Sequence, residues 1–310
     1  AAPPRPRPQT PPPGPDSPLK SEDTLRGFGF AMGAYLFWGF LPLYMKMVAH
    51  IPAPEVVAHR VLWSLPIAGL VLFLLGRTGD IGRVLRDPKA LAMGCVTAAL
   101  ISVNWGVYVW AISVDRALDA ALGYYINPLF SVFLGSMLLG ERLSKLQWAA
   151  VGLATTAVVV LAAALGSLPW PALALTTTWG FYAYFKRSLP IGPNQGFLLE
   201  VMILTPFAMA YLIWLWLSGA SHFVPLTFDM WLLMGCGIVT AVPLLLYANG
   251  AKGLRLTTIG IMQYIAPTMI MLVAVLVFKE PFGAARAIAF PMIWAALGLY
   301  TYAMFRGRQK

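Results

Sequence analysis

The chain has 310 residues, of which 59% are hydrophobic and only 11% are charged, and its mean hydropathy is +0.73. Because soluble domains carry about a quarter charged residues, this composition excludes an ordinary soluble fold and indicates an integral membrane protein. A net charge of +10 is compatible with nucleic-acid binding, but that function needs a basic face on a folded aqueous domain, for which the sequence leaves no room.

The first segment, residues 1–24, is dominated by proline with scattered arginine and has no apolar core. We expect it to form a disordered cytoplasmic tail rather than a cleaved signal peptide. Its Pro-x-x-Pro-like runs could bind a partner domain, although an unselected solvated leader is the simpler interpretation.

Apolar runs of membrane-spanning length follow the tail. A bilayer core about 30 Å thick is crossed by roughly 20 apolar residues in a helix. Ten such runs are present, with ends uncertain by about four residues. They cover residues 25–48, 55–76, 90–113, 118–139, 144–165, 170–187, 194–217, 229–252, 257–278 and 286–305. The sequence therefore predicts an all-α integral membrane protein with ten transmembrane helices joined by short loops.

Lysine and arginine are distributed unevenly between the predicted loops. With the N-terminus inside, the outer loops hold only Arg116, Lys279 and Arg286, whereas the other loop cations lie on the inner side. This is the positive-inside pattern, and it predicts that both termini are cytoplasmic. Cys95 and Cys236 fall inside spans, where a thiol behaves as a small apolar side chain, so we expect no disulfide.

A short phrase occurs twice, at residues 125–128 (Tyr-Ile-Asn-Pro) and 264–267 (Tyr-Ile-Ala-Pro), and each copy is followed by a glutamate thirteen residues after its proline. Similar offsets relate Trp38 to Trp179 and Tyr108 to Tyr247. We therefore expect two related five-helix halves, residues 25–165 and 166–310. A repeat with an odd number of spans is inverted, as in many secondary transporters, and a cavity between the halves is expected.

The two repeated prolines also predict a local distortion. Pro128 and Pro267 each remove an N–H and displace the carbonyl four residues earlier, at Tyr124 and Gln263. Freed carbonyls in a membrane are tolerated where protein or water satisfies them. We expect both spans to be kinked, to face the interior and to act as hinges, with a simple packing kink as the alternative.

Two longer phrases indicate a family. Residues 55–64 (EVVAHRVLWS) and 123–129 (GYYINPL) resemble the RarD-type members of the EamA branch of the drug/metabolite transporter superfamily. The resemblance covers nearly everything after the tail. It implies efflux of small metabolites, and the relation to the YddG exporters implies amino acids, particularly aromatic ones, together with some amphipathic toxic compounds.

Polar and aromatic side chains at mid-membrane depth are the candidates for substrate contact, because such groups are costly in lipid. They offer ring faces, hydroxyls and amides but no fixed central charge, which suits a zwitterionic or weakly cationic aromatic molecule better than a phosphorylated one. The predicted substrate-binding residues are Trp38, Asn104, Tyr108, Tyr124, Asn127, Trp179, Tyr182, Tyr247 and Gln263.

Several of these residues have a structural alternative. Asn104 could tie two helices together by a hydrogen bond, and Trp38, Trp179 and Tyr247 could simply pack. Tryptophans near span ends are expected to anchor the protein at the membrane interface. These are Trp110, Trp148, Trp170, Trp214, Trp216 and Trp231.

A charged group, Lys46, Glu55, His59 and Arg60, surrounds the first outer turn. Arg60 lies about 9 Å into its span at 1.5 Å per residue, within reach of snorkelling to the surface. It is a candidate outer gate or contact for a substrate carboxylate. The alternative is a structural pairing of Glu55 with His59 or Arg60.

The sequence contains no motif for catalysis, a metal or a cofactor, so we expect a carrier and not an enzyme. Its acids lie near span ends, which favours facilitated movement without obligatory proton coupling. We expect a monomeric exporter of zwitterionic aromatic and other neutral amino acids in a bacterial inner membrane. An efflux carrier for cationic or aromatic drugs and a non-transporting receptor or scaffold stay open as alternatives.

Overall fold

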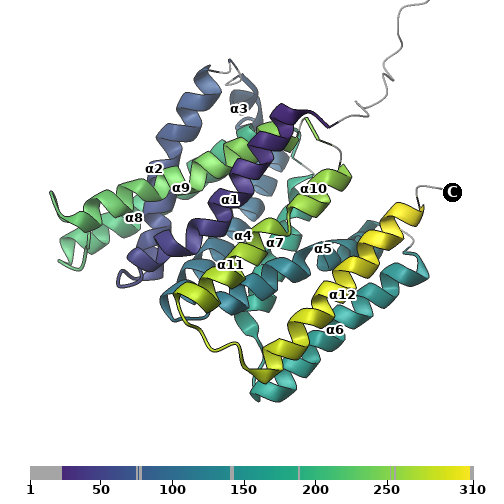
Figure 1. The fold of residues 1–310 in the computed structure, drawn as a ribbon. Coiled ribbons are helices and arrows are strands. Elements are labelled where there is room, and N and C mark those ends of the chain that lie inside the picture. The colour runs from purple at the N-terminus through teal and green to yellow at the C-terminus, as the bar shows by residue number, and fades with distance from the viewer. Residues whose placement is uncertain are drawn as a thin grey trace, which may run out of the picture.

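The computed structural model describes residues 23–74, 76, 79–139, 143–187, 189–251, 253–254 and 256–307. Nearly all of the predicted tail therefore lies outside the described residues, as does Glu141, the glutamate that follows the first repeated phrase. Throughout the described ranges the regular structure is helical (Figure 1).

The helices follow the predicted spans closely. Each predicted end lies within three residues of an observed one, and only the short α3 was not expected. The elements are α1 (Leu25–Met47), α2 (Ala53–Leu74), α3 (Gly79–Val84), α4 (Pro88–Ser113), α5 (Ala117–Leu139), α6 (Lys145–Leu165), α7 (Trp170–Lys186), α8 (Pro193–Leu217), α9 (Phe228–Ala251), α10 (Leu256–Met262), α11 (Ile265–Leu272), the π-helical η1 (Val273–Val277) and α12 (Gly283–Gly307).

Local capping explains several of these boundaries. Asp87 accepts hydrogen bonds from the first amides of α4, directly before Pro88 at the first helical position. Ser144 and Gln147 form a reciprocal capping box at the start of α6. Gly166 ends α6 in the left-handed conformation that glycine adopts most readily. These signals explain why the two helices begin, and why α6 ends, at the observed residues.

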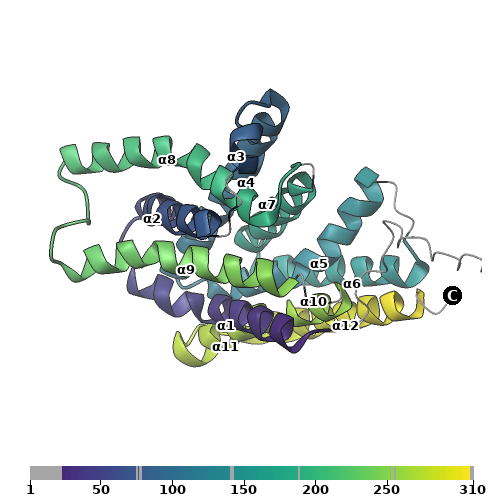
Figure 2. The same ribbon diagram turned by 90° about the horizontal axis from the view of Figure 1, so that it is seen from above.

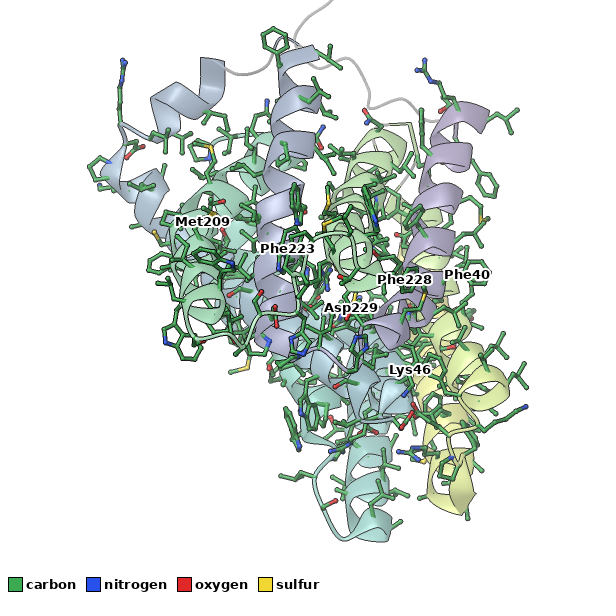
Figure 3. All side chains as sticks on the ribbon, turned by 90° about the vertical axis from the view of Figure 1, so that its left-hand side faces the viewer. Phe40, Lys46, Met209, Phe223, Phe228 and Asp229 are labelled. Atoms are coloured by element: carbon green, nitrogen blue, oxygen red, sulfur yellow. The ribbon has the colours of Figure 1, made fainter. Side chains whose placement is uncertain are left out.

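Nine segments of the described chain are long and apolar enough to cross a membrane. The tenth predicted span is α7, which has 17 residues and packs between α4 and α5. Exposed apolar side chains such as Phe40, Met209 and Phe228 cover the outside of the bundle (Figure 3). A surface of this kind is expected to face lipid.

The two repeated prolines have different consequences for the helices that contain them. The ninth span is interrupted at Gln263 and Tyr264, between α10 and α11, whereas α5 continues without a break through Pro128. At the interruption the amide of Tyr264 bonds to the carbonyl of Ile261, three residues earlier. Pro267 cannot supply an amide to the carbonyl of Gln263, so one helical hydrogen bond is missing at the interruption.

The repeated phrases meet in the interior. The hydroxyl of Tyr125, from the first phrase, hydrogen bonds to the hydroxyl of Thr268, which directly follows the second phrase, at 2.6 Å. Thr268 in turn donates to the carbonyl of Tyr264 at 2.7 Å, beside the helix interruption. The α5–α11 crossing thus joins the same part of both halves.

The helix contacts have the symmetry expected of two related halves. Among the most extensive contacts, replacing each helix by its counterpart in the other half gives a contact that is also observed. Three contacts, α2 with α8, α5 with α11 and α6 with α12, each join corresponding helices of the two halves. The contact of α1 with α9 corresponds to that of α7 with α4, and the contact of α1 with α11 to that of α7 with α5. Figure 2 shows α6 and α12 side by side at one edge of the bundle and α8 toward another.

Glycine permits the closest of these approaches. A Cβ added to Gly237 in α9 would overlap the main chain of Trp63 in α2, and one added to Gly123 in α5 would lie 2.8 Å from the carbonyl oxygen of Ala172 in α7. Both positions lie at contacts between the two halves. Such close backbone contact is typical of helix packing in membranes.

Candidate functional site

Arg60 lies in the interior of the bundle, because α2 directs it toward α4 and α9. It is 3% exposed, its guanidinium carbon lies 4.9 Å from the centre of the Trp105 ring, and its Nε donates to the Thr240 hydroxyl at 3.0 Å. Its Nη1 has no hydrogen-bond partner among the described residues. The expectation that Arg60 snorkels to the outer surface is therefore wrong, as is the expectation of an interior without a fixed charge.

Two predicted residues, Tyr108 and Tyr124, accompany Arg60. Their ring centres are 5.9 Å apart, and Tyr108 lies one helical turn after Trp105, the ring that Arg60 contacts, on the same face of α4. Tyr108 is 3% exposed and its hydroxyl has no partner within the described part of the chain. Asn127, one helical turn after Tyr124, is also buried, and its Oδ1 is likewise unpartnered among described residues.

A second aromatic cluster joins α1 to α9. Trp38 lies 5.6 Å from Tyr247 and 5.7 Å from Tyr35, and the two tyrosines are 5.9 Å apart. Tyr35 was not among the predicted site residues, although it lies three residues before Trp38 and hence on the same helix face. The cluster packs against α10 and α11 through Met262 and Ala266.

A third cluster lies at the predicted cytoplasmic side, between α7 and α8. The Trp179 and Tyr182 rings are 5.6 Å apart. Tyr182 donates its hydroxyl to Glu200 at 3.1 Å, and Lys186 donates to Glu200 at 2.6 Å and to the Tyr182 hydroxyl at 2.8 Å. Glu200 is only 1% exposed, so this acid is buried although it lies near a span end.

The two predicted amide residues outside these clusters have separate positions. Asn104 is buried in α4 and donates to the Leu175 carbonyl at 3.1 Å and the Thr178 hydroxyl at 2.9 Å, both in α7. It makes the interhelical hydrogen bond that was considered as its alternative role. Gln263 is half-buried in the interruption between α10 and α11.

The charged group at the first outer turn is organised differently from the expectation. Glu55 is fully buried and accepts hydrogen bonds from the amide of His222 at 2.8 Å and its Nδ1 at 2.7 Å, so it does not pair with His59 or Arg60. His59 stacks on Phe223 with ring centres 5.0 Å apart. The physical reason is the loop between α8 and α9, which returns over the start of α2.

Further ion pairs join helices at this same side, which the charge pattern predicts to be outer. Lys46 pairs with Asp115 at 2.6 Å (Lys46 is labelled in Figure 3), and the buried Asp119 binds Arg116 and Arg286. Glu280 accepts the amides of Ala117 and Leu118 at 2.6 and 3.0 Å. These contacts hold the predicted outer side together.

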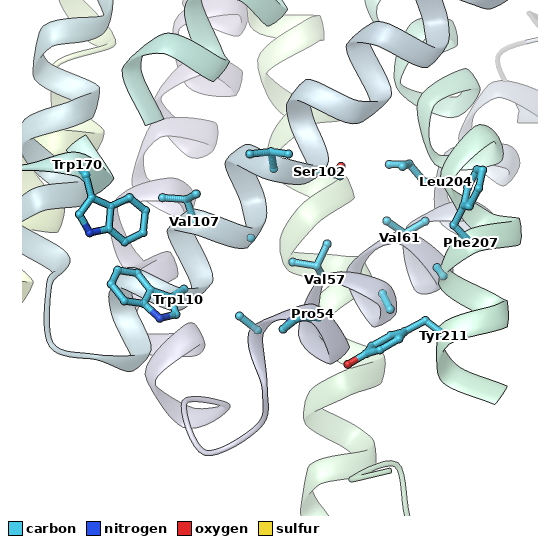
Figure 4. A pocket seen from close by; sticks show the side chains of 15 residues that line it. Pro54, Val57, Val61, Ser102, Val107, Trp110, Trp170, Leu204, Phe207 and Tyr211 are labelled. Atoms are coloured by element: carbon cyan, nitrogen blue, oxygen red, sulfur yellow. The ribbon is translucent and has the colours of Figure 1, made fainter. Parts of the chain in front are cut away.

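A pocket of about 740 Å³ lies between α2, α4 and α8 rather than among the predicted site residues (Figure 4). Its lining is almost wholly apolar. Trp110 and Trp170, expected as interfacial anchors, form one wall with ring centres 4.7 Å apart. Pro54, Val57, Val61, Val107, Leu204, Phe207 and Tyr211 form much of the remainder.

Comparisons with known proteins agree with this architecture. The EamA-like transporter family profile matches residues 25–163. A crystal structure with 20% sequence identity aligns over 89% of this chain and 97% of its own, with a TM-score of 0.59, which shows a shared fold.

Relatives in bacteria match over almost the whole chain. An "Uncharacterized transporter" of Vibrio cholerae is 40% identical over 90% of this chain and 93% of its own. A "Protein RarD" of Streptomyces exfoliatus is 38% identical over 93% and 92%. A "Chloramphenicol-sensitive protein RarD" of Pseudomonas aeruginosa is 30% identical over 88% and 92%. With its all-helical, multi-span structure, the chain is thus a membrane transporter, and it belongs to the EamA-like transporter family as a RarD-type member.

Proposed function

We propose that this transporter exports small amphipathic metabolites, foremost aromatic and other neutral amino acids, from a bacterial cytoplasm across the inner membrane. One observation carries the proposal: predicted site residues from both halves of the chain gather in three aromatic clusters inside the bundle. The clusters are Tyr108 with Tyr124, Trp38 with Tyr35 and Tyr247, and Trp179 with Tyr182.

The chemistry of these clusters favours an aromatic cargo. Tyrosine and tryptophan combine large ring faces with a polar group, so they bind amphipathic molecules in several orientations. Recognition of a phosphate calls for converging cations. Among the described interior residues, Arg60 has no second cation beside it, and Lys186 is already bound to Glu200. A phosphorylated substrate is therefore disfavoured.

Alternating access would come from a change in tilt between the two five-helix halves, 25–165 and 166–310. The helix contacts support this division, because the most extensive of them repeat when each helix is replaced by its counterpart in the other half. The distribution of lysine and arginine supports cytoplasmic termini. The interruption at Gln263 and Tyr264 is the proposed hinge in the second half, and Pro128 marks its counterpart. Each chain encloses its own site, so a monomer suffices.

Movement is proposed to follow the substrate gradient without obligatory proton coupling. The buried acids of the described residues each have a partner: Glu55 binds His222, Asp119 binds Arg116 and Arg286, Glu200 binds Lys186, and Glu280 accepts two backbone amides. Uphill accumulation of substrate in proteoliposomes driven by a pH gradient alone would refute this part of the proposal.

The test is uptake of labelled phenylalanine, tyrosine and leucine into proteoliposomes, with unlabelled amino acids, amphipathic drugs and nucleosides as competitors. We expect saturable uptake that the aromatic amino acids inhibit best. Trp38→Ala, Trp179→Ala and Asn104→Ala should reduce uptake, whereas Trp214→Ala on the exposed face of α8 should not. Wild-type uptake by both tryptophan variants would remove those residues from the site.

Efflux of aromatic or cationic drugs is the second candidate. It is favoured by the same three aromatic clusters and by the relative that is named for chloramphenicol sensitivity. Competition by drugs but not by amino acids in the same assay would select it. Binding without any uptake would instead indicate a receptor or scaffold.

A further inference from the structure

Arg60 is a buried cation whose charge is only partly compensated. The Trp105 ring and the Thr240 hydroxyl are neutral partners, and Nη1 is unpartnered within the described chain. A guanidinium removed from water is costly unless an anion or several hydrogen bonds replace the lost hydration. The site around Arg60 therefore lacks a negative group.

The acids of the described chain do not supply this group. Glu55 is bound by His222, Glu200 by Lys186 and Tyr182, and Asp119 by Arg116 and Arg286. Glu280 accepts the amides of Ala117 and Leu118, so each buried acid of the described chain is already engaged elsewhere. No acid among the described residues is left to supply the missing anion, whereas a bound molecule can supply it.

The repeat provides an internal comparison. An offset of 140 residues relates Pro66 of α2 to Pro206 of α8, and the same offset relates Arg60 to Glu200. The corresponding positions therefore carry opposite charges. Glu200 is neutralised by Lys186 at 2.6 Å, whereas Arg60 has no such counter-ion among the described residues. The fold neutralises one of the two charges and leaves the other available.

The groups around Arg60 define what anion fits. The Tyr108 hydroxyl is buried and has no partner in the described ranges, and Tyr108 lies one turn after Trp105, the ring that Arg60 contacts, on the same face of α4. The free Nη1 and this hydroxyl can both donate, which matches the two acceptor oxygens of a carboxylate. A single cation suits a monoanion, and the rings of Trp105 and Tyr124 suit an apolar body attached to it.

We propose that Arg60, assisted by Tyr108, binds the carboxylate of the transported molecule, so that the cargo is an organic carboxylate and not a simple amine. This inference rests on the proposed transport function and deepens it. A requirement for a carboxylate distinguishes amino acids from cationic drugs as cargo. The aromatic clusters alone do not distinguish them.

The test measures binding to the purified full-length protein in detergent by calorimetry or thermal shift. The probes share a phenyl ring: L-phenylalanine and 3-phenylpropionate carry a carboxylate, and L-phenylalaninamide and phenethylamine do not. The wild type should bind the carboxylates about 10-fold to 100-fold more tightly, as expected for one charge-assisted contact. Chloride alone serves as the inorganic arm.

The variants assign this preference to residues. Arg60→Gln should abolish the difference between carboxylates and amines, Arg60→Lys should retain part of it, and Tyr108→Phe should reduce it several-fold. Arg26→Gln, on the exposed start of α1, is the matched control and should bind as the wild type. If Arg60→Gln does not fold, the wild-type preference and the Tyr108→Phe variant still decide the question.

Equal binding of carboxylates and amines by the wild type, no binding of any probe, or chloride binding as tight as that of the carboxylates would overturn the proposal. Failure of the transport function is distinguishable. Carboxylate binding that depends on Arg60, without flux in vesicles, would reject transport and keep this site. Flux that is the same for carboxylates and amines, and that is unchanged in Arg60→Gln, would support transport and reject this site.

Discussion

Removal of one partner from the buried Lys186–Glu200 pair should destabilise the protein, and the two single variants should differ. Lys186→Met leaves Glu200, which is 1% exposed, with only the Tyr182 hydroxyl. Breaking a buried pair costs about 3 to 5 kcal/mol. Because the Tyr182 hydrogen bond is retained, we expect the lower end of this range.

Glu200→Gln should cost less. The Lys186 side chain is 20% exposed at the end of α7, so its ammonium can turn toward water when the acid is removed. The double variant Lys186→Met with Glu200→Gln removes both charges and should recover most of the stability of the wild type. The order of stability is then wild type, double variant, Glu200→Gln and Lys186→Met.

The assay is thermal unfolding in one detergent, read by intrinsic fluorescence, for the wild type and all three variants. Lys89→Met is the control, because that lysine is exposed at the start of α4. A double variant whose loss equals the sum of the single losses would show that the two side chains are uncoupled and would refute this reasoning.

Three further changes test the packing and the outer contacts. Gly237→Ala should lower the free energy of unfolding by about 1 to 3 kcal/mol, because the added methyl group overlaps the main chain of Trp63. Chemical unfolding measures this loss. Gly152→Ala, where the space is open, is the control. Glu280→Ala should cost about 1 to 3 kcal/mol in the same measurement by leaving the amides of Ala117 and Leu118 without an acceptor. Burial raises the pKa of the Glu280 carboxyl above its unfolded value, although the hydrogen bonds from those two amides act to lower it. The folded state therefore binds this proton more tightly than the unfolded state does. The resulting contribution to stability is fully present at pH values below the unfolded pKa. That contribution is lost as the pH rises through the folded pKa, and the melting temperature should then fall relative to Glu280→Gln. Glu55→Gln should weaken the hold on the loop between α8 and α9 and speed proteolysis near His222, whereas wild-type resistance would contradict the role of this contact.

The spans could be predicted from the sequence because lipid imposes one strong condition, a helix of about 20 apolar residues. The observed helices therefore differ from the predicted runs by only a few residues at each end. The repeated phrases also identified residues that meet in the interior, since Tyr125 contacts Thr268 beside the second copy.

Side-chain partners could not be predicted in the same way. Arg60 lies within snorkelling distance of the surface, and only the positions of Trp105 and Thr240 on other helices show that it turns inward. Glu55 has plausible partners one turn away, yet a distant loop brings His222 to it. Such choices depend on tertiary packing, which the spacing along one helix does not contain.

The repeated prolines show a related limit. The same residue type in the same phrase breaks the helix at Gln263 but not at Tyr124. Local sequence predicts the loss of a hydrogen bond at both places. Whether the helix bends or breaks depends on neighbours, such as Thr268, which bonds to the Tyr264 carbonyl at the interruption.

The proposed transport depends on alternating access of one interior site to both sides of the membrane. Its most direct test is counterflow: proteoliposomes loaded with unlabelled phenylalanine are placed in a trace of labelled phenylalanine without any ion gradient. We predict transient, saturable accumulation of label that internal phenylalanine stimulates. Label entering no faster than in protein-free liposomes, or at a rate independent of the internal amino acid, would contradict the account.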